Sequence, residues 1–575
     1  MQKRWLVKTP VESTLVEEFR STLKVDRIVA QLLIQRGITT FEAAESFFRP
    51  KLEHLHDPFL MKDMQEAVQR VNSAIDNGEK VLLFGDYDVD GTTAVALMYS
   101  FLKNKHEALD YYIPDRYSEG YGVSYQGIDF AAEHGFSLII SLDCGIRSVD
   151  HVRYAKEKGV DFIVCDHHNP GNELPDCIVL DPKRSDCNYP YKELSGCGVG
   201  FKLLQGLCAE NDWNQNELFG FLDLLAVSIG ADIVPVTGEN RILCFHGMKQ
   251  LNDHPRLAFV ELLKIAKREF PVTLTDVVFT IAPRINAAGR LRSGKHAVEL
   301  MISQKIDEIK ELALAIDADN KERRELDQEM TAEALEMIDD DASTVTSKST
   351  VVFKNDWHKG VVGIVASRLI EKHYRPTIVL TESNGKATGS ARTVNNFDIH
   401  AALIKCEHLL EQFGGHTHAA GMTMALDNVA AFKETFEKVV AESITLEDQT
   451  PEQEVDLELD FNEIFTPGEN RMKIPRLKRI LEQFEPHGPG NMKPVFMSKN
   501  VFSTDIRLLK EVHLKLSMTQ PTSDVIVEGI GFNLGEKIDE VASGLPFDVV
   551  FTLESNKWRD KETLQLNIKD IRSVL

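Results

Sequence analysis

Short apolar runs alternate with longer amphipathic stretches between residues 81 and 165. The runs are VLLFG (81–85), LDYYIP (109–114), LIISL (138–142) and VDFIVC (160–165). The stretches between them, 93–103, 126–135 and 148–159, have the length and apolar spacing of helices. Buried strands separated by helices of this length predict βαβ units and a parallel sheet.

The pattern divides the rest of the chain into segments of different character. Residues 307–341 lack Gly and Pro and are dense in charge, which predicts one long helix that connects two α/β regions. Five short alternating strands within the last 75 or so residues predict an OB-like antiparallel β-barrel. The predicted organisation is a helical segment (1–50), a parallel-sheet domain (51–306), the long helix (307–341), a second α/β domain (342–445) and the barrel domain (446–575).

Charge and cysteine content narrow the class of protein. The 65 Lys and Arg residues against 89 Asp and Glu residues give a net charge of −24, which excludes nucleic-acid affinity built on global positive charge. One local cluster, RMKIPRLKR (471–479), is basic, and is interpreted either as a phosphate contact or as a solvated helix face. The eight cysteines form no CxxC pair, so a zinc ribbon is not indicated and a reducing, cytoplasmic location is predicted. The N-terminus is neither a signal peptide nor a membrane span, and no membrane partner is expected.

The strongest chemical signal is GDYDVDGTT (85–93), which places Asp86, Asp88 and Asp90 directly after a predicted strand. An EF-hand loop shares the alternating acids, but it requires a Glu where this chain has Leu97, and a helix rather than a strand precedes it. A P-loop fails because no Gly-Lys-Ser/Thr follows.

Two other predicted strands also end in acids or histidines. Asp143 follows LIISL, and Asp166, His167 and His168 follow VDFIVC. Because ligands bind at the carboxyl ends of parallel strands, these side chains are expected to converge. An Asp after a strand is often only a helix N-cap, but several carboxylates in one crevice repel each other and must protonate or bind cations.

Carboxylate and imidazole ligands together suit Mn²⁺ or Mg²⁺, and histidine favours Mn²⁺. Asp232, which follows an apolar run in GADIVP, is a further candidate ligand, with a buried structural role as the alternative. The number of ligands suggests two ions, as in enzymes that attack phosphorus with an activated water.

These motifs, in this order, resemble the DHH phosphoesterase superfamily. IPDRYSEGYG (113–122), SGCGVG (195–200), ADIVPVTGENR (231–241) and PRINAAGRL (283–291) are similar to the RecJ family of bacterial exonucleases. WHKGVVGIVASRLIEKHYRP (357–376), GSAR (389–392) and FGGHTHAAGM (413–422) resemble its DHHA1 domain, and FEPHGPGNMKPVF (484–496) its OB domain. The resemblance implies a 5′ to 3′ single-stranded-DNA exonuclease of DNA repair and recombination that depends on Mn²⁺ or Mg²⁺.

Site roles carried over from the resemblance fall on matching positions. The implied metal ligands are Asp86, Asp88, Asp90, Asp143, His167 and Asp232. The implied catalytic set is His168, as a ligand or as an imidazole beside the scissile phosphate, with Asp143, Asp88 and Asp90.

Candidate substrate contacts come from basic and glycine-rich segments. Guanidinium groups bind phosphate bidentately, which favours Arg116, Arg284 and Arg290 as phosphate contacts, against the ordinary role of surface charges. Ser390 and Arg392 are similar to a substrate-binding element of DHHA1 domains. FGGHTHAAG offers backbone N–H groups at Gly414 and Gly415 and imidazoles at His416 and His418; the alternative is a glycine turn that caps a helix. Three loop tyrosines, Tyr117, Tyr121 and Tyr125, have two possible roles: they stack on bases, or they pack in the ordinary way.

Two other functions remain alternatives. A DHH phosphodiesterase that acts on nanoRNA or cyclic dinucleotides, or a pyrophosphatase, would not need the extra barrel. A non-enzymatic replication scaffold of the same fold would not need the ligands, which are all present. The expected partner is single-stranded DNA, and the resemblance adds a single-strand-binding protein and a helicase.

Overall fold

The computed structural model describes residues 3–341, 346–465, 473–559 and 561–574. The chain forms two compact units, one of residues 7–317 with 454–575 and one of residues 1–6 with 318–453. The boundary falls within α16 (Ile306–Asp340), the predicted long helix, which is 35 residues long. Among the described residues, no helix combines the length and hydrophobicity that a membrane crossing requires.

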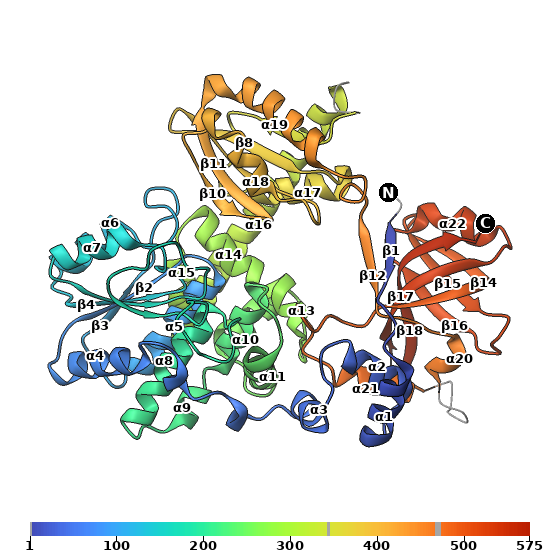
Figure 1. The fold of residues 1–575 in the computed structure, drawn as a ribbon, viewed down its shortest axis with the longest axis horizontal. Helices are drawn as coiled ribbons and strands as arrows, with labels where there is room; N and C mark the ends of the chain where they lie inside the picture. Colours follow the sequence, from blue (N-terminus) through green and yellow to red (C-terminus); the bar gives the residue numbers. More distant parts are fainter. Residues whose placement is uncertain (1–2, 342–345, 466–472, 560, 575) are drawn as a thin grey trace. The chain divides into compact units, whose positions relative to one another are not determined.

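The predicted parallel sheet is present in the larger unit (Figure 1), with the strand order β3-β2-β4-β5-β6. Its strands are β2 (Val81–Gly85), β3 (Leu109–Tyr112), β4 (Leu138–Leu142), β5 (Asp161–Cys165) and β6 (Ile178–Leu180), all paired in parallel. The sequence did not predict β6, because three residues are too few to show a pattern. The order of the chain reverses between β2 and β4, so a ligand site is expected at their carboxyl ends.

Helices cover both faces of this sheet because alternate residues of each strand point to opposite sides (Figure 1). Leu83 and Ile140 pack with α4 (Met64–Asp76), α5 (Val89–Leu102) and α8 (Gly196–Glu210). Phe84 and Ile139 pack against α6 (Tyr125–Glu133) and α7 (Val149–Glu157). This explains why the strands read as continuous apolar runs rather than alternating ones.

A helical layer follows the sheet in the same unit. It contains α10 (Leu222–Ala231), α11 (Gly238–Asp253), α12 (Leu257–Ile265), α13 (Leu274–Asp276), α14 (Ala282–Leu291) and α15 (Lys295–Ile302). A π-helical turn, Val277–Ile281, joins α13 to α14. Helices α5, α8 and α10 share the large core that lies on one side of the sheet.

The smaller unit contains a mixed five-stranded sheet in the order β10-β11-β9-β8-β7. Its strands are β7 (Thr350–Phe353), β8 (Thr377–Ser383), β9 (Lys386–Arg392), β10 (Gln412–His416) and β11 (Ala419–Ala425). Helices α17 (Val362–His373), α18 (Ile399–Ile404) and α19 (Val429–Ser443) pack on it. The alternative that FGGHTHAAG is a glycine turn that caps a helix is wrong, since the segment is the β10–β11 hairpin with a two-residue turn.

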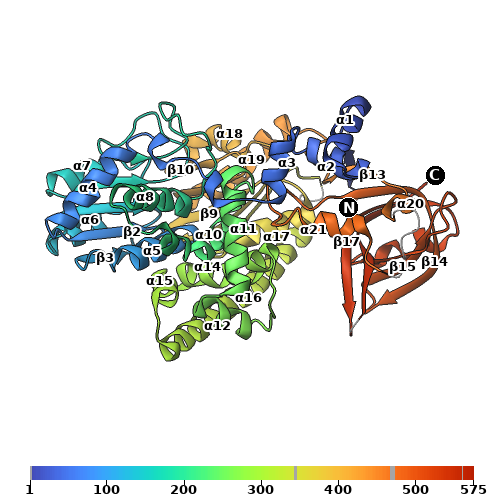
Figure 2. The same cartoon turned by 90° about the horizontal axis from the view of Figure 1, so that it is seen from below.

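The C-terminal part of the larger unit is a closed β-barrel, shown in red in Figure 2. Strands β14 (Phe496–Leu509), β15 (His513–Thr519), β16 (Val527–Gly531), β18 (Lys561–Ser573) and β17 (Phe547–Trp558) pair in that order. Pairing of β17 with β14 closes the barrel, which confirms the predicted OB-like fold. The basic segment before it is only partly described. Arg471 lies outside the described residues, and Lys478 on α21 (Arg476–Glu482) is buried and bound to Glu482 at 2.7 Å.

The N-terminal helices belong to the core of the barrel domain, which the sequence did not reveal. The first described element is a strand, β1 (Arg4–Val7), and it is followed by α1 (Ser13–Leu23), α2 (Arg27–Ile34) and α3 (Phe41–Phe48). Phe19 and Leu33 share one hydrophobic cluster with Phe496 and Phe551 of the barrel. The two ends of the chain therefore stabilise each other.

Arg241 of α11 links three segments of the larger unit through its guanidinium. It donates to the carbonyls of Phe47 and Phe484 at 2.9 Å each, and also to those of Glu485 and Pro486. Its Cζ lies 3.9 Å from the centroid of the Phe47 ring. Burial lowers its pKa to about 10, so the group stays charged at neutral pH.

We expect Arg241→Lys to lower the free energy of unfolding by about 2–4 kcal/mol, because one ammonium cannot replace the planar fork and buried carbonyls lose their donor. Denaturant unfolding followed by tryptophan fluorescence measures the change. Arg153→Lys is the matched control, since Arg153 is exposed on α7 and, among the described residues, forms an ion pair with Asp150 alone. Equal stability of the two variants would show that Arg241 does not hold these segments together.

Candidate metal centre

Three neighbouring strands end on one row of the sheet. Gly85 pairs in register with Leu142, and Leu142 with Cys165. Asp86, Asp143 and Asp166 are the next residues of their chains, so they leave the sheet side by side. The predicted convergence of the acidic and histidine motifs is therefore present in the fold.

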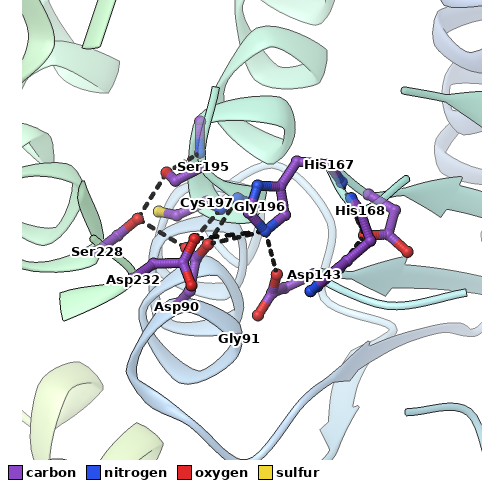
Figure 3. Close-up of polar contacts among 12 residues, drawn as sticks. Asp90, Gly91, Asp143, His167, His168, Ser195, Gly196, Cys197, Ser228 and Asp232 are labelled. Carbon is purple, nitrogen blue, oxygen red and sulfur yellow. Dashed lines mark hydrogen bonds and ion pairs between the residues drawn. The ribbon is translucent and has the colours of Figure 1, made fainter. Parts of the chain in front are cut away.

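His167 lies at the centre of the cluster (Figure 3). Its Nε2 is 3.2 Å from Asp143 Oδ1, 3.5 Å from Asp232 Oδ2 and 3.8 Å from Asp90 Oδ2. Asp232, which ends α10, reaches the cluster from a different element. The alternative of a purely structural Asp232 is therefore disfavoured.

The six predicted ligands and His168 fall into three overlapping groups with the spacing of metal ligands. In each group, ligand atoms lie within 4.8 Å of one another. The groups are Asp86–Asp88–Asp143, Asp90–His167–Asp232 and Asp143–His167–His168. Asp143 and His167 each belong to two of the groups, so the groups form one continuous cluster.

The donor atoms fit a cation because they lack other partners. Both oxygens of Asp86, Oδ1 of Asp143 and both ring nitrogens of His167 are buried and accept or donate no hydrogen bond in the described structure. Unpaired buried polar atoms are costly, and divalent ions would satisfy the carboxylate oxygens and one ring nitrogen of His167.

Burial and repulsion raise the pKa of several of these acids. Burial, and then the charge of Asp88, raises the pKa of Asp86, while burial and the charges of Asp90, Asp88 and Asp232 raise that of Asp143. Burial likewise raises the pKa of Asp232 and lowers that of His167. Without cations the centre favours protonated acids and a neutral imidazole, and bound cations would restore the charged ligands.

Asp90 is fixed by the start of α8. Its carboxylate accepts hydrogen bonds from the backbone N–H groups of Gly196 and Cys197 at 2.7 and 2.9 Å, and from Ser228 Oγ at 2.7 Å (Figure 3). A helix N-terminus favours a negative charge at this place. SGCGVG therefore holds the carboxylate of Asp90, a predicted ligand, which is a role that its sequence alone did not indicate.

Two glycines and one residue with a strained backbone allow the acids of the cluster to lie close to neighbouring backbone. A Cβ on Gly196 would lie 2.5 Å from Asp143 Oδ1, and a Cβ on Gly91 would lie 2.5 Å from the carbonyl oxygen of Asp86. Asp143 itself has a φ of 62°, a conformation that is uncommon outside glycine and typical of functional sites. Gly91 is therefore required by packing and not by an EF-hand turn.

Asp166 orients His168 rather than joining the ligand groups. Its Oδ1 accepts from His168 Nδ1 at 2.7 Å and from the backbone N–H of His168 at 3.1 Å, and its Oδ2 accepts from the N–H of Ile146. Burial opposes the charged forms, but this hydrogen bond outweighs it, lowering the pKa of Asp166 and raising that of His168 to about 9. His168 Nε2 lies 3.2 Å from the hydroxyl of Tyr121, an exposed side chain.

The predicted substrate contacts of this unit have different surroundings. The Arg116 guanidinium lies 5.1 Å from the Tyr87 ring, and its charge acts on Asp86. The Arg290 carbonyl accepts from the Tyr117 hydroxyl, and the charge of Arg290 also reaches Tyr87. Arg284 is mostly buried and its Nε donates to Asp317 at 2.9 Å, so part of its fork serves to hold α14 to α16. Tyr125 packs against His151 and Tyr154 of α7 instead of the site.

The smaller unit brings its own predicted contacts together on one sheet. Ser390 pairs with Gly421, which pairs with Gly414, and Arg392 pairs with Ala419, which pairs with His416. Arg392 Nη1 donates to Ser390 Oγ at 2.7 Å, and both side chains lie beside Gly363 in the first turn of α17. Gly415 has a φ of 151°, and a Cβ there would lie 2.3 Å from the Ala419 carbonyl oxygen. The rings of His416 and His418 are 6.1 Å apart.

Comparison with known proteins gives matches along most of the chain. The sequence models named DHH family, N-terminal domain, DHHA1 domain and RecJ OB domain match residues 80–229, 346–442 and 455–570. The single-stranded-DNA-specific exonuclease RecJ of Bacillus subtilis (strain 168) is 38% identical over 573 residues, which cover 99% of this chain and 70% of that protein.

Solved structures give a similar result. The structure of RecJ from Thermus thermophilus in complex with Mn²⁺ has a TM-score of 0.84 at 27% identity, covering 100% of this chain and 80% of that one. The same protein in complex with Mg²⁺ has a TM-score of 0.78 at 25% identity, with 100% and 79% coverage.

We expect Asp143→Asn to lower the number of bound Mn²⁺ ions and to cut metal-dependent activity at least about 100-fold, because the residue belongs to two ligand groups. In chelator, thermal unfolding should occur at the same or a higher temperature, since one repelling charge is gone. The raised pKa means that ionisation of Asp143 destabilises the metal-free fold as the pH rises above about 4, so the gain should be larger at pH 7 than at pH 4. Asp150→Asn, on the exposed side of α7, is the control; a variant at position 143 with normal metal content would remove this residue from the centre.

We expect Asp166→Asn to lose activity more than 10-fold while retaining bound metal, because the imidazole of His168 loses its orientation. In the metal-free protein, the Asp166–His168 ion pair stabilises the fold most between pH 3.9 and 6.5, which are about the ordinary pKa values of Asp and His. This contribution to stability is lost as the pH rises through about 9, the raised pKa of His168. The stability difference between wild type and variant, measured by denaturant unfolding, should shrink over that upper range. A difference that does not vary with pH would mean that Asp166 acts only through its backbone contacts.

Proposed function

Because the chain belongs to the RecJ family of single-stranded-DNA-specific exonucleases, we propose that it hydrolyses single-stranded DNA from the 5′ end with Mn²⁺ or Mg²⁺. The observation that carries the proposal is the strand-end cluster, in which buried, unpartnered carboxylate and imidazole atoms form overlapping ligand groups. A non-enzymatic scaffold would not need to maintain this cluster, with its strained Asp143 and crowded charges.

The residues of the centre have separable roles in this proposal. Asp86, Asp88, Asp90, Asp143, His167 and Asp232 would hold two divalent cations. When bound, such cations lower the pKa of a water molecule and offset charge on phosphate oxygens. His168, held protonated by Asp166, is suited to donate to a phosphate or leaving-group oxygen. Arg116 and Arg290 supply positive charge near Asp86 and Tyr87.

The remaining predicted contacts fit a substrate that extends beyond one phosphate. We place Arg284, Ser390, Arg392, Gly414, Gly415, His416 and His418 among the residues that bind the nucleic acid. The barrel domain, which matches the RecJ OB domain, would bind the strand at a distance from the cleaved bond. The eight cysteines are free thiols, which supports a cytoplasmic location. A single-strand-binding protein and a helicase stay predicted partners.

The test uses the full chain with Mn²⁺ and single-stranded DNA labelled at either end. Early release of labelled mononucleotide from the 5′ label, with a shortening ladder from the 3′ label, is the expected result. Asp143→Asn is the inactive control. Preference for nanoRNA or a cyclic dinucleotide in competition would instead favour the phosphodiesterase alternative, and absence of hydrolysis with all substrates would favour a scaffold.

We expect His416→Ala to lower kcat by roughly 10²–10³-fold with a smaller effect on binding, as for loss of one donor to a developing negative charge. The bound Mn²⁺ count should not change, because all predicted ligands lie in the other unit. Single-turnover rates and elemental analysis measure both. His408→Ala, an exposed histidine on the same unit, is the control. Loss of metal in the His416 variant would make this residue a ligand or a support of one.

A further inference from the structure

A fourth strand ends on the same row of the sheet and also continues into an acid. Leu180 of β6 pairs in register with Cys165 of β5. Asp181 therefore leaves β6 beside the point where Asp166 leaves β5. Asp181 is completely buried, and it belongs to none of the ligand groups.

Asp166 and Asp181 make the same local contact. The carboxylate of Asp166 accepts the backbone N–H of His168 at 3.1 Å, and that of Asp181 accepts the backbone N–H of Lys183 at 2.7 Å. Each acid thus fixes the residue two positions after it at the edge of the sheet. On β5 the fixed residue is an imidazole of the centre, and on β6 it is an ammonium.

The loop that carries Lys183 is anchored on both sides of this residue. Asp181 holds its backbone, and the next residue, Arg184, is buried with its Nη1 bound to Asp63 Oδ2 at 2.5 Å and to the Val179 carbonyl oxygen at 2.6 Å. Such fixed backbones hold a side chain in place without a mobile loop.

Lys183 lies at the same edge of the sheet as the metal centre. Cys165 and Leu180 are register partners, and Lys183 follows Leu180 by three residues, as His168 follows Cys165. The only ion-pair contact of Lys183 in the described structure is with the half-exposed Glu193, at 3.6 Å, which is too long for a hydrogen bond.

We propose that Lys183 is a substrate-binding residue whose ammonium contacts a phosphate oxygen of the strand at the metal centre, and that Asp181 positions it. The inference rests on the proposed function and adds a residue to it. A negatively charged phosphodiester that approaches several carboxylates is repelled by them. The compact ammonium of Lys183, at the edge of the sheet, reduces this repulsion.

The experiment measures binding of a 5′-phosphorylated single-stranded oligonucleotide to the full chain in chelator, over a range of salt concentrations. Lys183→Gln should weaken binding by roughly 10-fold or more and reduce the salt slope by about 0.7, the value for one lost phosphate contact on a single strand. Lys183→Arg should keep the slope. The melting temperature and the bound Mn²⁺ count should stay at the wild-type values.

Glu193→Gln is the matched control, because it removes the ion-pair partner and leaves the ammonium. It should bind DNA at least as tightly as the wild type. If Glu193→Gln and Lys183→Gln both lose affinity and both lower the melting temperature, the pair is structural and the inference is wrong.

Asp181 is tested by rescue. Asp181→Ala should weaken binding as much as Lys183→Gln, with no further loss in the double variant, whereas Asp181→Asn keeps an acceptor for the Lys183 N–H and should restore binding. If Lys183→Gln has the affinity and the salt slope of the wild type, the inference is wrong. The proposed function would still stand in that case, provided that the wild type cleaves single-stranded DNA. A wild type that neither binds nor cuts the strand would overturn both.

Discussion

Repulsion between buried carboxylates is the constraint on which the larger unit depends. Asp86, Asp90 and Asp143 are all buried. Asp86 and Asp143 offer ligand atoms within 4.8 Å of each other, and Asp90 and Asp143 both lie within 4 Å of His167 Nε2. The fold offsets this repulsion unevenly. Asp90 receives two backbone N–H groups and a hydroxyl, whereas in the described structure neither oxygen of Asp86 accepts a hydrogen bond, and nor does Oδ1 of Asp143. The incomplete compensation leaves a centre whose lowest-energy state contains cations.

The strand-end acids and the βαβ order were predictable from sequence because both depend on local pattern. An apolar run of five residues followed by Asp is visible without a structure, and the rule that parallel strands present their carboxyl ends together does the rest. Asp232 was a weaker prediction, since it ends a helix and its approach to His167 is set by how α10 packs on α5 and α8.

Other features depend on contacts between distant segments and left no local signal. Gly196 and Ser228, which hydrogen-bond to Asp90, lie more than a hundred residues from it in the sequence. For FGGHTHAAG the sequence left a helix cap open as an alternative, because glycine permits both a cap and a tight hairpin and only pairing with β9 decides between them. The N-terminal helices carry apolar stripes whose partner, the barrel core, lies at the other end of the chain.

That shared core has a consequence for how the protein is made. Phe19 and Leu33 become buried against strands that are separated from them by more than 400 residues of chain, such as Phe496 and Phe551. At about 5–20 residues per second on the ribosome, these helices would wait roughly 20–100 s for their partner. The parallel-sheet core and the smaller unit are complete earlier in synthesis, so the last folding event joins the first-made and the last-made segments. Chaperone demand should therefore centre on the exposed apolar faces of α1, α2 and α3 during that interval.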